Sequence, residues 1–262
     1  MVTVKDILEY VYSIAPAHMK ESWDKVGLNV GRMDREVTKV LVALDPFYHV
    51  CEEAKEFGAQ LLLTHHALIW EPGFVTDETQ WGKCALYLIE NGIACINAHT
   101  NADCAPGGVN DLLAQRLGLS DITILDPQGP DKEGRIWGLL RCGTVPQQPL
   151  AEFLATVKTQ LGCPGLKYAN GGKPVHKVAV GGGSCASELH LAAEAGCDTF
   201  VTADIKYNSY WDAVGLGINL IDAGHFHTEN PVAGYLARKV QEAFPEITVK
   251  LSENHTDCAN FF

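Results

Sequence analysis

Three groups of histidine and carboxylate residues follow apolar runs in this chain. The first is His65-His66, directly after Leu61 to Thr64, and the others span His99 to Asp103 and His225 to Glu229. Imidazole and carboxylate ligands together suit zinc, iron or manganese better than calcium or a thiolate-bound ion. Parallel strands end at one edge of an open α/β sheet, which is where such sheets place their binding sites. The pattern therefore predicts one metal site built from three strand ends.

The first two groups also have simpler explanations. Successive side chains of a strand face opposite sides, so His65 and His66 can share a site only if the strand ends near Thr64 and the backbone turns. Otherwise one imidazole packs and the other is exposed. Asp103 is a metal ligand, or else it forms an Asx turn or caps a helix. His99 is a base beside the metal, or it hydrogen-bonds a backbone carbonyl in the core.

The third group has the most specific spacing. His225 and Glu229 are four residues apart, which places them on one face if a helix has begun. Pro231 is tolerated only in the first turn of a helix, so we expect the helix to begin close to Glu229, with His225 in the loop before it. A glutamate there is also favoured by the helix dipole alone. His227, between the two, is an additional candidate for proton transfer.

The elements that must position these groups alternate as in an α/β protein with parallel strands. We predict helices over 2–15, 52–57, 83–90 and 150–161, and strands over 40–44, 61–64, 93–98 and 135–143. The second half repeats the plan of the first, and Thr202 lies as far beyond Lys177 as Thr64 lies beyond Lys39. The predicted fold is two similar α/β units with mostly parallel sheets and the metal site in the cleft between them.

The unit boundaries are predicted from turn residues. The segment 126–131 is rich in proline, glycine and aspartate and is expected to link the halves. The first unit then spans 1–126, completed by a C-terminal helix over 229–262, and the second spans 127–228. The Gly181-Gly182-Gly183 loop has neither a G-x-G-x-x-G spacing nor a P-loop lysine, which favours a tight strand-to-helix turn over an anion cradle.

Composition excludes several classes of protein. The net charge of −12 disfavours nucleic-acid binding, which uses Lys and Arg to neutralise phosphates. No apolar run is long enough to span a membrane, and the charged residues after Met1 are unlike a secretory signal. Nine cysteines without a C-x-x-C pair are typical of reduced thiols. We expect a cytoplasmic protein with a small-molecule substrate and neither a nucleic-acid nor a membrane partner.

The chain closely resembles the Nif-three-like dinuclear metal family, whose members are named GTP cyclohydrolase I type 2 homologues. The resemblance covers nearly the whole chain and rests on motifs that occur in family order. They are Ile14-Ala15-Pro16, Trp23 to Leu28, Thr64-His65-His66, His99 to Asp103, Thr202-Ala203-Asp204 and Asp222 to Glu229.

The resemblance implies a ligand set and an assembly. His65, His66, Asp103, His225 and Glu229 would bind two divalent ions, zinc, iron or manganese, with Glu229 bridging them. The family assembles as a ring-shaped homohexamer. Longer relatives carry an inserted domain, for which the short segment 131–175 leaves no room.

Three residues depart from the family pattern. Ala67 replaces the proline that usually follows the two histidines, which should alter the loop more than the ligands. Ala203 replaces the glycine of Thr-Gly-Asp, and Asn208 stands where a histidine is common. Any role that this histidine has in substrate binding or proton transfer in the family therefore has no imidazole to perform it at position 208 of this chain.

The implied activity is that of a metal-dependent hydrolase. A metal-activated hydroxide would open the guanine ring of GTP, or act on another nucleotide, with His99 or His227 moving protons. Two alternatives stay open, a metal-dependent phosphoesterase and a non-catalytic metal-binding regulatory scaffold. Five ligands over two ions leave positions for water, unlike the closed shell of a structural zinc site, and this favours catalysis.

Overall fold

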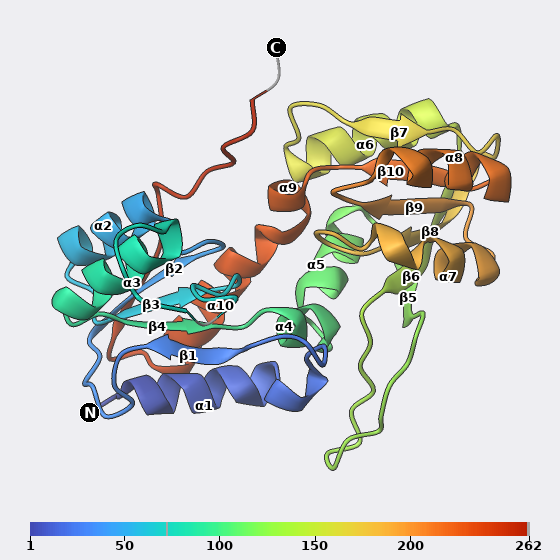
Figure 1. Ribbon diagram of the computed structural model, residues 1–262. Coiled ribbons are helices and arrows are strands. Elements are labelled where there is room, and N and C mark those ends of the chain that lie inside the picture. Colours follow the sequence, from blue (N-terminus) through green and yellow to red (C-terminus); the bar gives the residue numbers. More distant parts are fainter. Residues whose placement is uncertain (72, 261–262) are drawn as a thin grey trace. The chain divides into compact units, whose positions relative to one another are not determined.

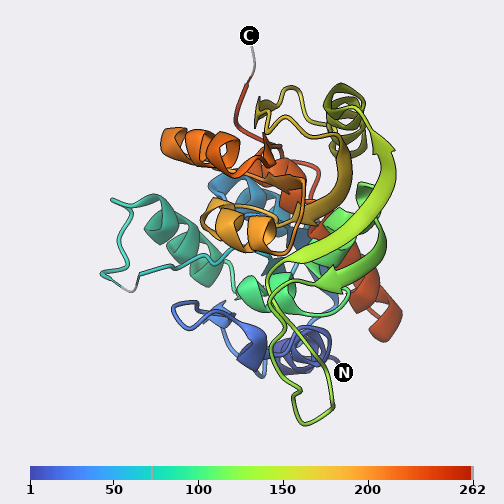
Figure 2. The same ribbon diagram turned by 90° about the vertical axis from the view of Figure 1, so that its right-hand side faces the viewer.

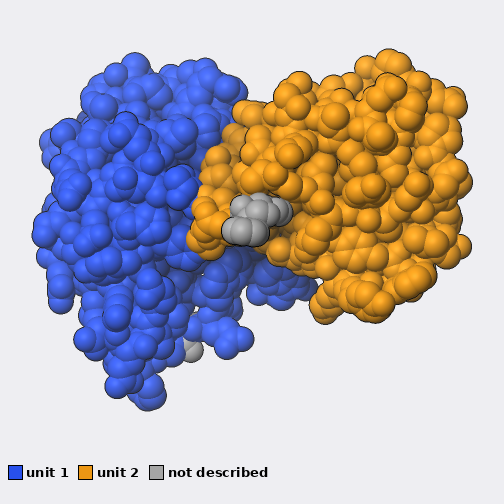
Figure 3. Space-filling view, turned by 90° about the horizontal axis from the view of Figure 1, so that it is seen from above, with its two compact units in different colours: residues 1–105, 232–256 blue, residues 106–231, 257–262 orange. Residues whose placement is uncertain are grey.

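The computed structural model describes residues 1–71 and 73–260. The chain forms two compact units, which Figure 3 colours separately. Unit 1 comprises residues 1–105 and 232–256, and unit 2 comprises residues 106–231 and the C-terminal residues from Asp257 on. Each unit is built on its own sheet, so the mixed α/β fold with two sheets is confirmed.

Unit 1 holds a five-stranded sheet in the order β1-β4-β3-β2-β11 (Figure 1). The strands are β1 (Gly27–Val30), β2 (Lys39–Ala43), β3 (Leu61–Thr64), β4 (Ala94–Asn97) and β11 (Thr248–Leu251). All pairs are parallel except β1 with β4. Ala43, Thr64 and Asn97 are in register, so β2, β3 and β4 end at one edge of the sheet. This edge carries the first two histidine groups.

Helices cover both faces of the unit 1 sheet. They are α1 (Val4–Ile14), α2 (Tyr48–Phe57), α3 (Gln80–Glu90), α4 (Thr100–Cys104) and α10 (Pro231–Ala243), with a 3₁₀ turn at Ala17–Met19. Leu41 and Leu62 pack in one core cluster with residues of α2 and α3. Val42 and Leu63 alternate to the other face and are equally buried, and α1 and α10 lie on that side (Figure 1). The strands are therefore apolar throughout because both faces are covered.

Unit 2 holds a six-stranded sheet in the order β5-β6-β8-β9-β10-β7. The strands are β5 (Ser120–Ile124), β6 (Arg141–Gln148), β7 (Lys167–Ala169), β8 (Val175–Val180), β9 (Thr199–Thr202) and β10 (Asn219–Asp222). The strands β8, β9 and β10 are parallel, and the outer pairings are antiparallel.

Two helical layers enclose the unit 2 sheet. The helices are α5 (Val109–Arg116), α6 (Leu150–Leu161), α7 (Leu189–Glu194), α8 (Tyr207–Leu216) and α9 (His225–Glu229), with a 3₁₀ turn at Ala186–Glu188. Residues of α5 and α6 pack on Val180 and Val201, while residues of α7 and α8 pack with Phe200 from the opposite face.

The two units repeat the same three-strand core. Gly58 and Gly196 end the helices before the middle strands with positive φ angles of 77° and 75°. At the strand ends, the Ala98 amide donates to the Thr64 carbonyl at 3.0 Å, and the Ala223 amide donates to the Thr202 carbonyl at 2.9 Å. Equivalent backbone hydrogen bonds at equivalent positions support the internal repeat that the sequence predicts.

The connections differ from the predicted ones. The segment 126–131 lies within unit 2, in the long connection between the antiparallel strands β5 and β6 (Figures 1 and 2). The predicted boundary at residue 126 falls inside unit 2 because α5 and β5 pack with β6. The strand expected over 135–143 is β6, which begins later, at Arg141.

The C-terminal region also differs from the continuous helix expected over 229–262. Helix α10 ends at Ala243, and Pro245 follows, a residue that cannot continue a helix. The β-branched residues after it form β11, which pairs with β2 and completes the unit 1 sheet. Residues 261–262 of the predicted helix lie outside the described residues. Among the described helices, none has the length and apolar character that crossing a membrane requires.

Candidate metal centre

The end of β3 brings two imidazoles together in unit 1. The strand stops at Thr64, as predicted, and the His66 amide then donates to the Leu44 carbonyl at 2.9 Å. The Thr64 hydroxyl donates to the His66 carbonyl at 2.7 Å and holds this turn. The His65 and His66 ring centroids lie 5.0 Å apart. The turn therefore removes the alternation that would have separated the two side chains.

Both imidazoles are oriented through Nδ1. His65 is 0% exposed, and its Nδ1 lies 2.7 Å from the Ala98 carbonyl oxygen. The Nδ1 atom of His66 lies 2.6 Å from Asp45 Oδ1. Because carbonyl and carboxylate oxygens only accept, Nδ1 carries the proton in each ring and Nε2 presents the lone pair. This is the arrangement of metal-binding histidines, whose second nitrogen donates to a carbonyl or carboxylate.

Asp103 belongs to the short helix α4 and lies beside His65. Its Oδ1 atom is 3.6 Å from His65 Nε2, and the carboxylate is buried. The cap position of α4 is occupied by His99 and not by Asp103. The helix-cap explanation of Asp103 therefore does not apply, and a buried carboxylate faces the nitrogen that a metal would use.

His99 is fixed by a buried carboxylate. Its Nδ1 atom lies 3.0 Å from Asp24 Oδ2, and the Thr100 amide donates to the same oxygen at 3.0 Å. Burial opposes the charge on Asp24, but the hydrogen bonds from His99 and Thr100 outweigh it and hold the pKa of this carboxyl well below its usual range. The His99 ring also packs edge-on against Trp70, with centroids 4.8 Å apart.

The three histidines of unit 1 form a group that could hold a metal ion. One ring nitrogen from each of His65, His66 and His99 lies within 4.8 Å of the other two. The sequence assigned His99 to proton transfer, and the structure places it close enough to be a ligand as well. Three imidazoles with a neighbouring carboxylate match the chemistry of zinc, iron and manganese sites.

In unit 2, His225 and Glu229 lie on the same short helix. Helix α9 begins at His225, and Pro231 begins the separate helix α10. The helix that contains Pro231 begins at that residue, close to Glu229 as expected. The expectation that His225 lies in a loop is wrong, because His225 begins the short helix α9. His225 Nε2 is 2.9 Å from Glu229 Oε2, and His225 Nδ1 is 2.7 Å from Asp204 Oδ2.

The glycine loop after β8 makes room for Glu229. A Cβ atom on Gly183 would lie 2.0 Å from Glu229 Oε1 and 3.0 Å from His225 Nε2, and Gly183 has a φ of 62°. The Gly182 and Gly183 amides donate to Asn110 Oδ1 and Thr228 Oγ1, at 2.7 and 3.0 Å. The loop is the tight turn that the sequence predicts, and its glycines allow the close approach of a carboxylate.

His227 faces a pocket of unit 2. Its Nδ1 atom lies 3.2 Å from the Leu161 carbonyl oxygen, and its Nε2 atom lies 3.3 Å from Asp257 Oδ2. The pocket has a volume of about 280 Å³ and is also lined by His225, Asp204 and Lys167. A small molecule in this pocket would contact both His225 and His227.

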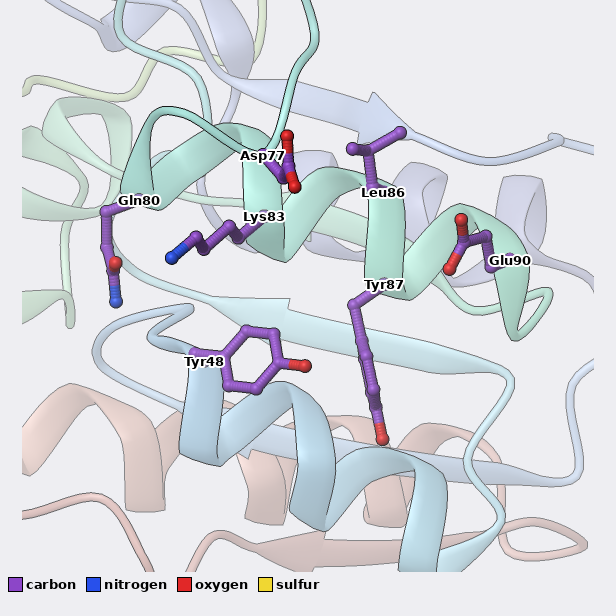
Figure 4. A pocket seen from close by; sticks show the side chains of 7 residues that line it. All are labelled: Tyr48, Asp77, Gln80, Lys83, Leu86, Tyr87 and Glu90. Carbon is purple, nitrogen blue, oxygen red and sulfur yellow. The ribbon is translucent and has the colours of Figure 1, made fainter.

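A larger pocket, of about 600 Å³, lies on the surface of α2 and α3 in unit 1. Tyr48 and Tyr87 extend into the space between the helices, with their rings edge to face at 5.2 Å (Figure 4). Lys83 and Glu90 also line it. None of the residues that line this pocket is a predicted ligand or proton-transfer residue.

Sequence reasoning missed the carboxylates that hold the histidines. They are Asp24 at His99, Asp45 at His66 and Asp204 at His225. Asp24 and Asp204 lie inside the motifs that carry the family resemblance, and Asp45 follows a strand at the same sheet edge. That signal was available, because a histidine ligand usually needs an acceptor for its second nitrogen.

The fold and these side chains define an α/β protein of two units with histidine and carboxylate groups that could hold a metal ion. The chain belongs to the family described as Duf34/NIF3 (NGG1p interacting factor 3), whose model matches residues 2–258. This confirms the family that the sequence motifs indicate.

Relatives with known names or structures are similar to this chain over almost its entire length. A Clostridium perfringens protein named GTP cyclohydrolase 1 type 2 homolog is 37% identical over 244 residues, covering 91% of each chain. A Streptomyces coelicolor protein of the same name is 36% identical and covers 98% of this chain and 93% of its own. The crystal structure of a Bacillus cereus protein related to NIF3 is similar, with a TM-score of 0.93 at 25% identity, covering 100% of this chain and 99% of the other.

Proposed function

We propose that this protein binds two divalent metal ions and uses them to hydrolyse a nucleotide, with GTP as the first substrate to test. The proposed ligands are His65, His66, Asp103, His225 and Glu229. The observation that carries the proposal is the orientation of the imidazoles, since an acceptor holds Nδ1 of His65, His66 and His225. The name of the Clostridium perfringens relative supports the choice of GTP.

The residues fit a divalent ion. His225 Nε2 and Glu229 Oε2 are 2.9 Å apart, close enough for both to bind one ion at bond lengths of about 2.0–2.2 Å. The carboxylates of Asp103 and Glu229 are both buried, and buried charges are normally paired or coordinate metals. When bound, the ions would supply Lewis acidity and lower the pKa of a water molecule.

The chain's own residues would move protons. Asp24 holds the Nδ1 atom of His99, so His99 exchanges protons through Nε2. His227 presents Nε2 to Asp257 beside a pocket large enough for a small molecule. Each is therefore a candidate general acid or base.

The first experiment separates metal binding from catalysis. Protein purified without chelators is analysed for metal by mass spectrometry and is then assayed for formate release from GTP and for turnover of phosphoesters. We expect two ions per chain and formate release. Turnover of a phosphoester alone would make the protein a phosphoesterase, whereas bound metal without any turnover would favour the regulatory scaffold.

A second experiment decides the role of His99. If His99 transfers protons, His99→Ala keeps the metal content and lowers turnover by roughly 10²- to 10⁴-fold, the usual contribution of general acid–base catalysis. Loss of metal in this variant would instead make His99 a ligand. The matched control is His190→Ala, which removes an exposed histidine of α7.

We also propose that the chain assembles as a homohexamer, as the resemblance implies. Helix α8 exposes Tyr207 and Trp211, a surface that contact with another subunit would bury. Light scattering on the purified protein should give six times the 28.5 kDa mass of one chain. A monomer across the accessible concentrations would contradict this assembly.

A further inference from the structure

Two aspartates outside the proposed ligand set contact proposed metal-binding histidines. Asp45 Oδ1 lies 2.6 Å from Nδ1 of His66 in unit 1. Asp204 Oδ2 lies 2.7 Å from Nδ1 of His225 in unit 2. In each pair the carboxylate meets the ring nitrogen opposite the one assigned to the metal.

The two pairs are built in the same way. Asp45 follows β2 and reaches the histidine after its parallel neighbour β3. Asp204 follows β9 and reaches the histidine after its parallel neighbour β10. Because neighbouring parallel strands end at the same edge, a residue just beyond one strand can support a side chain just beyond the next. The same kind of contact thus occurs in both units, although the pairs β2–β3 and β9–β10 are one strand apart in the repeat, in which β3 is equivalent to β9.

The backbone at Asp204 is specialised for this contact. Its φ is 52°, in the left-handed region, and Asp121 is the other non-glycine residue with a positive φ within residues 1–71 and 73–260. Aspartate tolerates this region better than most residues, but such conformations persist only where the surroundings impose them. The Asp204 side chain is 53% exposed, so packing does not explain its position, whereas the contact with His225 does.

Asp45 is held from two sides. Its second oxygen, Oδ2, lies 3.4 Å from Nε2 of His255, a residue of the C-terminal segment whose side chain is buried. His66 and His255 therefore share one carboxylate. The segment after β11 brings His255 to this place, so the far end of the chain fixes the carboxylate that orients His66.

The chemistry of the carboxylate decides which nitrogen of the ring is available. An ionised carboxylate only accepts hydrogen bonds, so it favours a proton on Nδ1 and leaves Nε2 for the metal. At His225 a second carboxylate, Glu229, lies 2.9 Å from Nε2, so that nitrogen can carry a proton as well until an ion binds. Asparagine has nearly the same shape, but its amide group can donate to Nδ1 and leave the proton on Nε2. The wrong tautomer is the reason that the equivalent substitution impairs the Ser-His-Asp triad.

We propose that Asp45 and Asp204 are positioning residues that fix His66 and His225 in the tautomer that presents Nε2 to a metal. The inference rests on the proposed metal-binding function. It goes beyond that function in assigning two residues that touch neither the ion nor the substrate.

The test reads the tautomer directly. Nitrogen-15 spectra of the metal-free protein report which ring nitrogen of His66 and His225 carries the proton, in the parent and in Asp45→Asn and Asp204→Asn. Zinc affinity is measured on the same samples by competition with a chromophoric chelator. At His66 we expect the proton on Nδ1 in the parent and a shift toward Nε2 in Asp45→Asn only. At His225, whose Nε2 also faces Glu229 Oε2 at 2.9 Å, we expect Nδ1 to carry a proton in the parent and to lose it in Asp204→Asn only. Each variant should bind zinc more weakly by roughly 10- to 100-fold.

Two further variants keep the test interpretable. Asp121→Asn makes the same exchange at the other residue with positive φ, on an exposed strand of unit 2, and should change neither the tautomers nor the zinc affinity. Asp45→Ala removes the acceptor without adding a donor, so His66 should populate both tautomers. Since Asp204 is half exposed, Asp204→Asn remains informative if the Asp45 variants fail to fold.

The outcomes separate this inference from the proposed function. Wild-type tautomers and zinc affinity in both asparagine variants would overturn the inference. A parent protein that binds no zinc would overturn the proposed function, while the spectra would still show whether the aspartates set the tautomers. Equal losses of zinc affinity in Asp121→Asn and Asp204→Asn would reduce the effect to backbone strain and would also overturn the inference.

Discussion

The ends of β3 and β9 occupy the same place in the two units but carry different chemistry. Each is the middle strand of three parallel strands, and each ends in threonine. After Thr64 the chain turns and places two imidazoles at the sheet edge. After Thr202 it places a buried Ala203 and then Asp204, whose carboxylate supports His225. One scaffold position thus supplies proposed ligands in unit 1 and a support for a ligand in unit 2.

The two strand ends also meet carbonyl groups that have different side-chain partners. His65 is completely buried because the Ala98 carbonyl accepts from its Nδ1 at 2.7 Å. The equivalent carbonyl in unit 2 belongs to Ala223, and it already accepts from the Cys163 thiol at 3.0 Å. A buried imidazole after Thr202 would therefore have to share this oxygen with the thiol or displace it. The comparison teaches that equivalent carbonyls at the two strand ends have different side-chain partners, an imidazole in unit 1 and a thiol in unit 2.

The largest effect should come from removing the imidazole of His65, because the equivalent position of unit 2 has no imidazole. The variant His65→Ala should weaken zinc binding by more than the roughly 10- to 100-fold that the loss of a supporting contact costs. Zinc titration against a competing chelator measures the effect. The control, His49→Ala, removes an exposed histidine of the same unit and should leave the affinity unchanged. Unchanged zinc affinity in His65→Ala would show that the turn after β3 serves packing.

Introducing a histidine at the position of unit 2 that is equivalent to His65 should destabilise unit 2. In Ala203→His, a bulky polar ring would enter a fully buried position, where it would compete with the Cys163 thiol for the Ala223 carbonyl. Overpacking and an unsatisfied buried polar group together should cost about 3 kcal/mol or more. Urea denaturation measures the change, with Ala203→Ser as a smaller control. A stable Ala203→His variant would mean that the two strand ends are more alike than their acceptors suggest.

The two sheets also differ at the edge beyond the repeated strands, and acid should reveal this difference. Unit 1 is completed by β11, after which Glu53 accepts hydrogen bonds from the Ser252 hydroxyl and the Glu253 and Asn254 amides. Burial raises the pKa of Glu53, but these contacts and Lys250 outweigh burial and leave the pKa below its usual value. Such a carboxyl stabilises the fold above its unfolded pKa, near 4.3, and this contribution is lost as the pH falls through the lower folded pKa.

The variant Glu53→Gln tests whether the charge of Glu53 holds the segment that follows β11. At pH 7 it should lower the free energy of unfolding by about 1–2 kcal/mol, because hydrogen bonds to a charged group are lost. The difference from wild type should shrink as the pH falls below about 4. The neighbouring Glu52→Gln, at an exposed position of the same helix, is the control. A difference that stays constant from pH 7 to pH 3 would argue that the charge of Glu53 does not hold the segment.

The smallest effect should come from restoring the family's usual histidine in α8. Asn208 is exposed in the first turn of this helix, close in sequence to Asp204. Asn208→His should change stability by less than about 0.5 kcal/mol and leave zinc affinity unaltered, because surface substitutions rarely do more. Calorimetry and zinc titration check this. A tighter zinc site in Asn208→His would show that this position of α8 can contribute to metal binding.

Local sequence patterns predicted the repeated core and the residues at its edge. Apolar runs of four or five residues between amphipathic segments indicated the buried parallel strands, and β3 was predicted with its observed bounds. The helix at 150–161 was also predicted with its observed bounds. The strand expected at 135–143 was displaced because its position depends on pairing with β8, which is distant in sequence.

The sequence by itself determined the α/β class, the repeat, the family and the types of side chain available for a metal. These follow from periodicity, composition and motif order, which are properties of neighbouring residues. Only the tertiary structure decided which atoms face one another: that β11 completes the first sheet, and that Asp45 and Asp204 orient His66 and His225. Those contacts join strand ends far apart along the chain, and a hydrogen bond between such residues exists only once the sheets have formed.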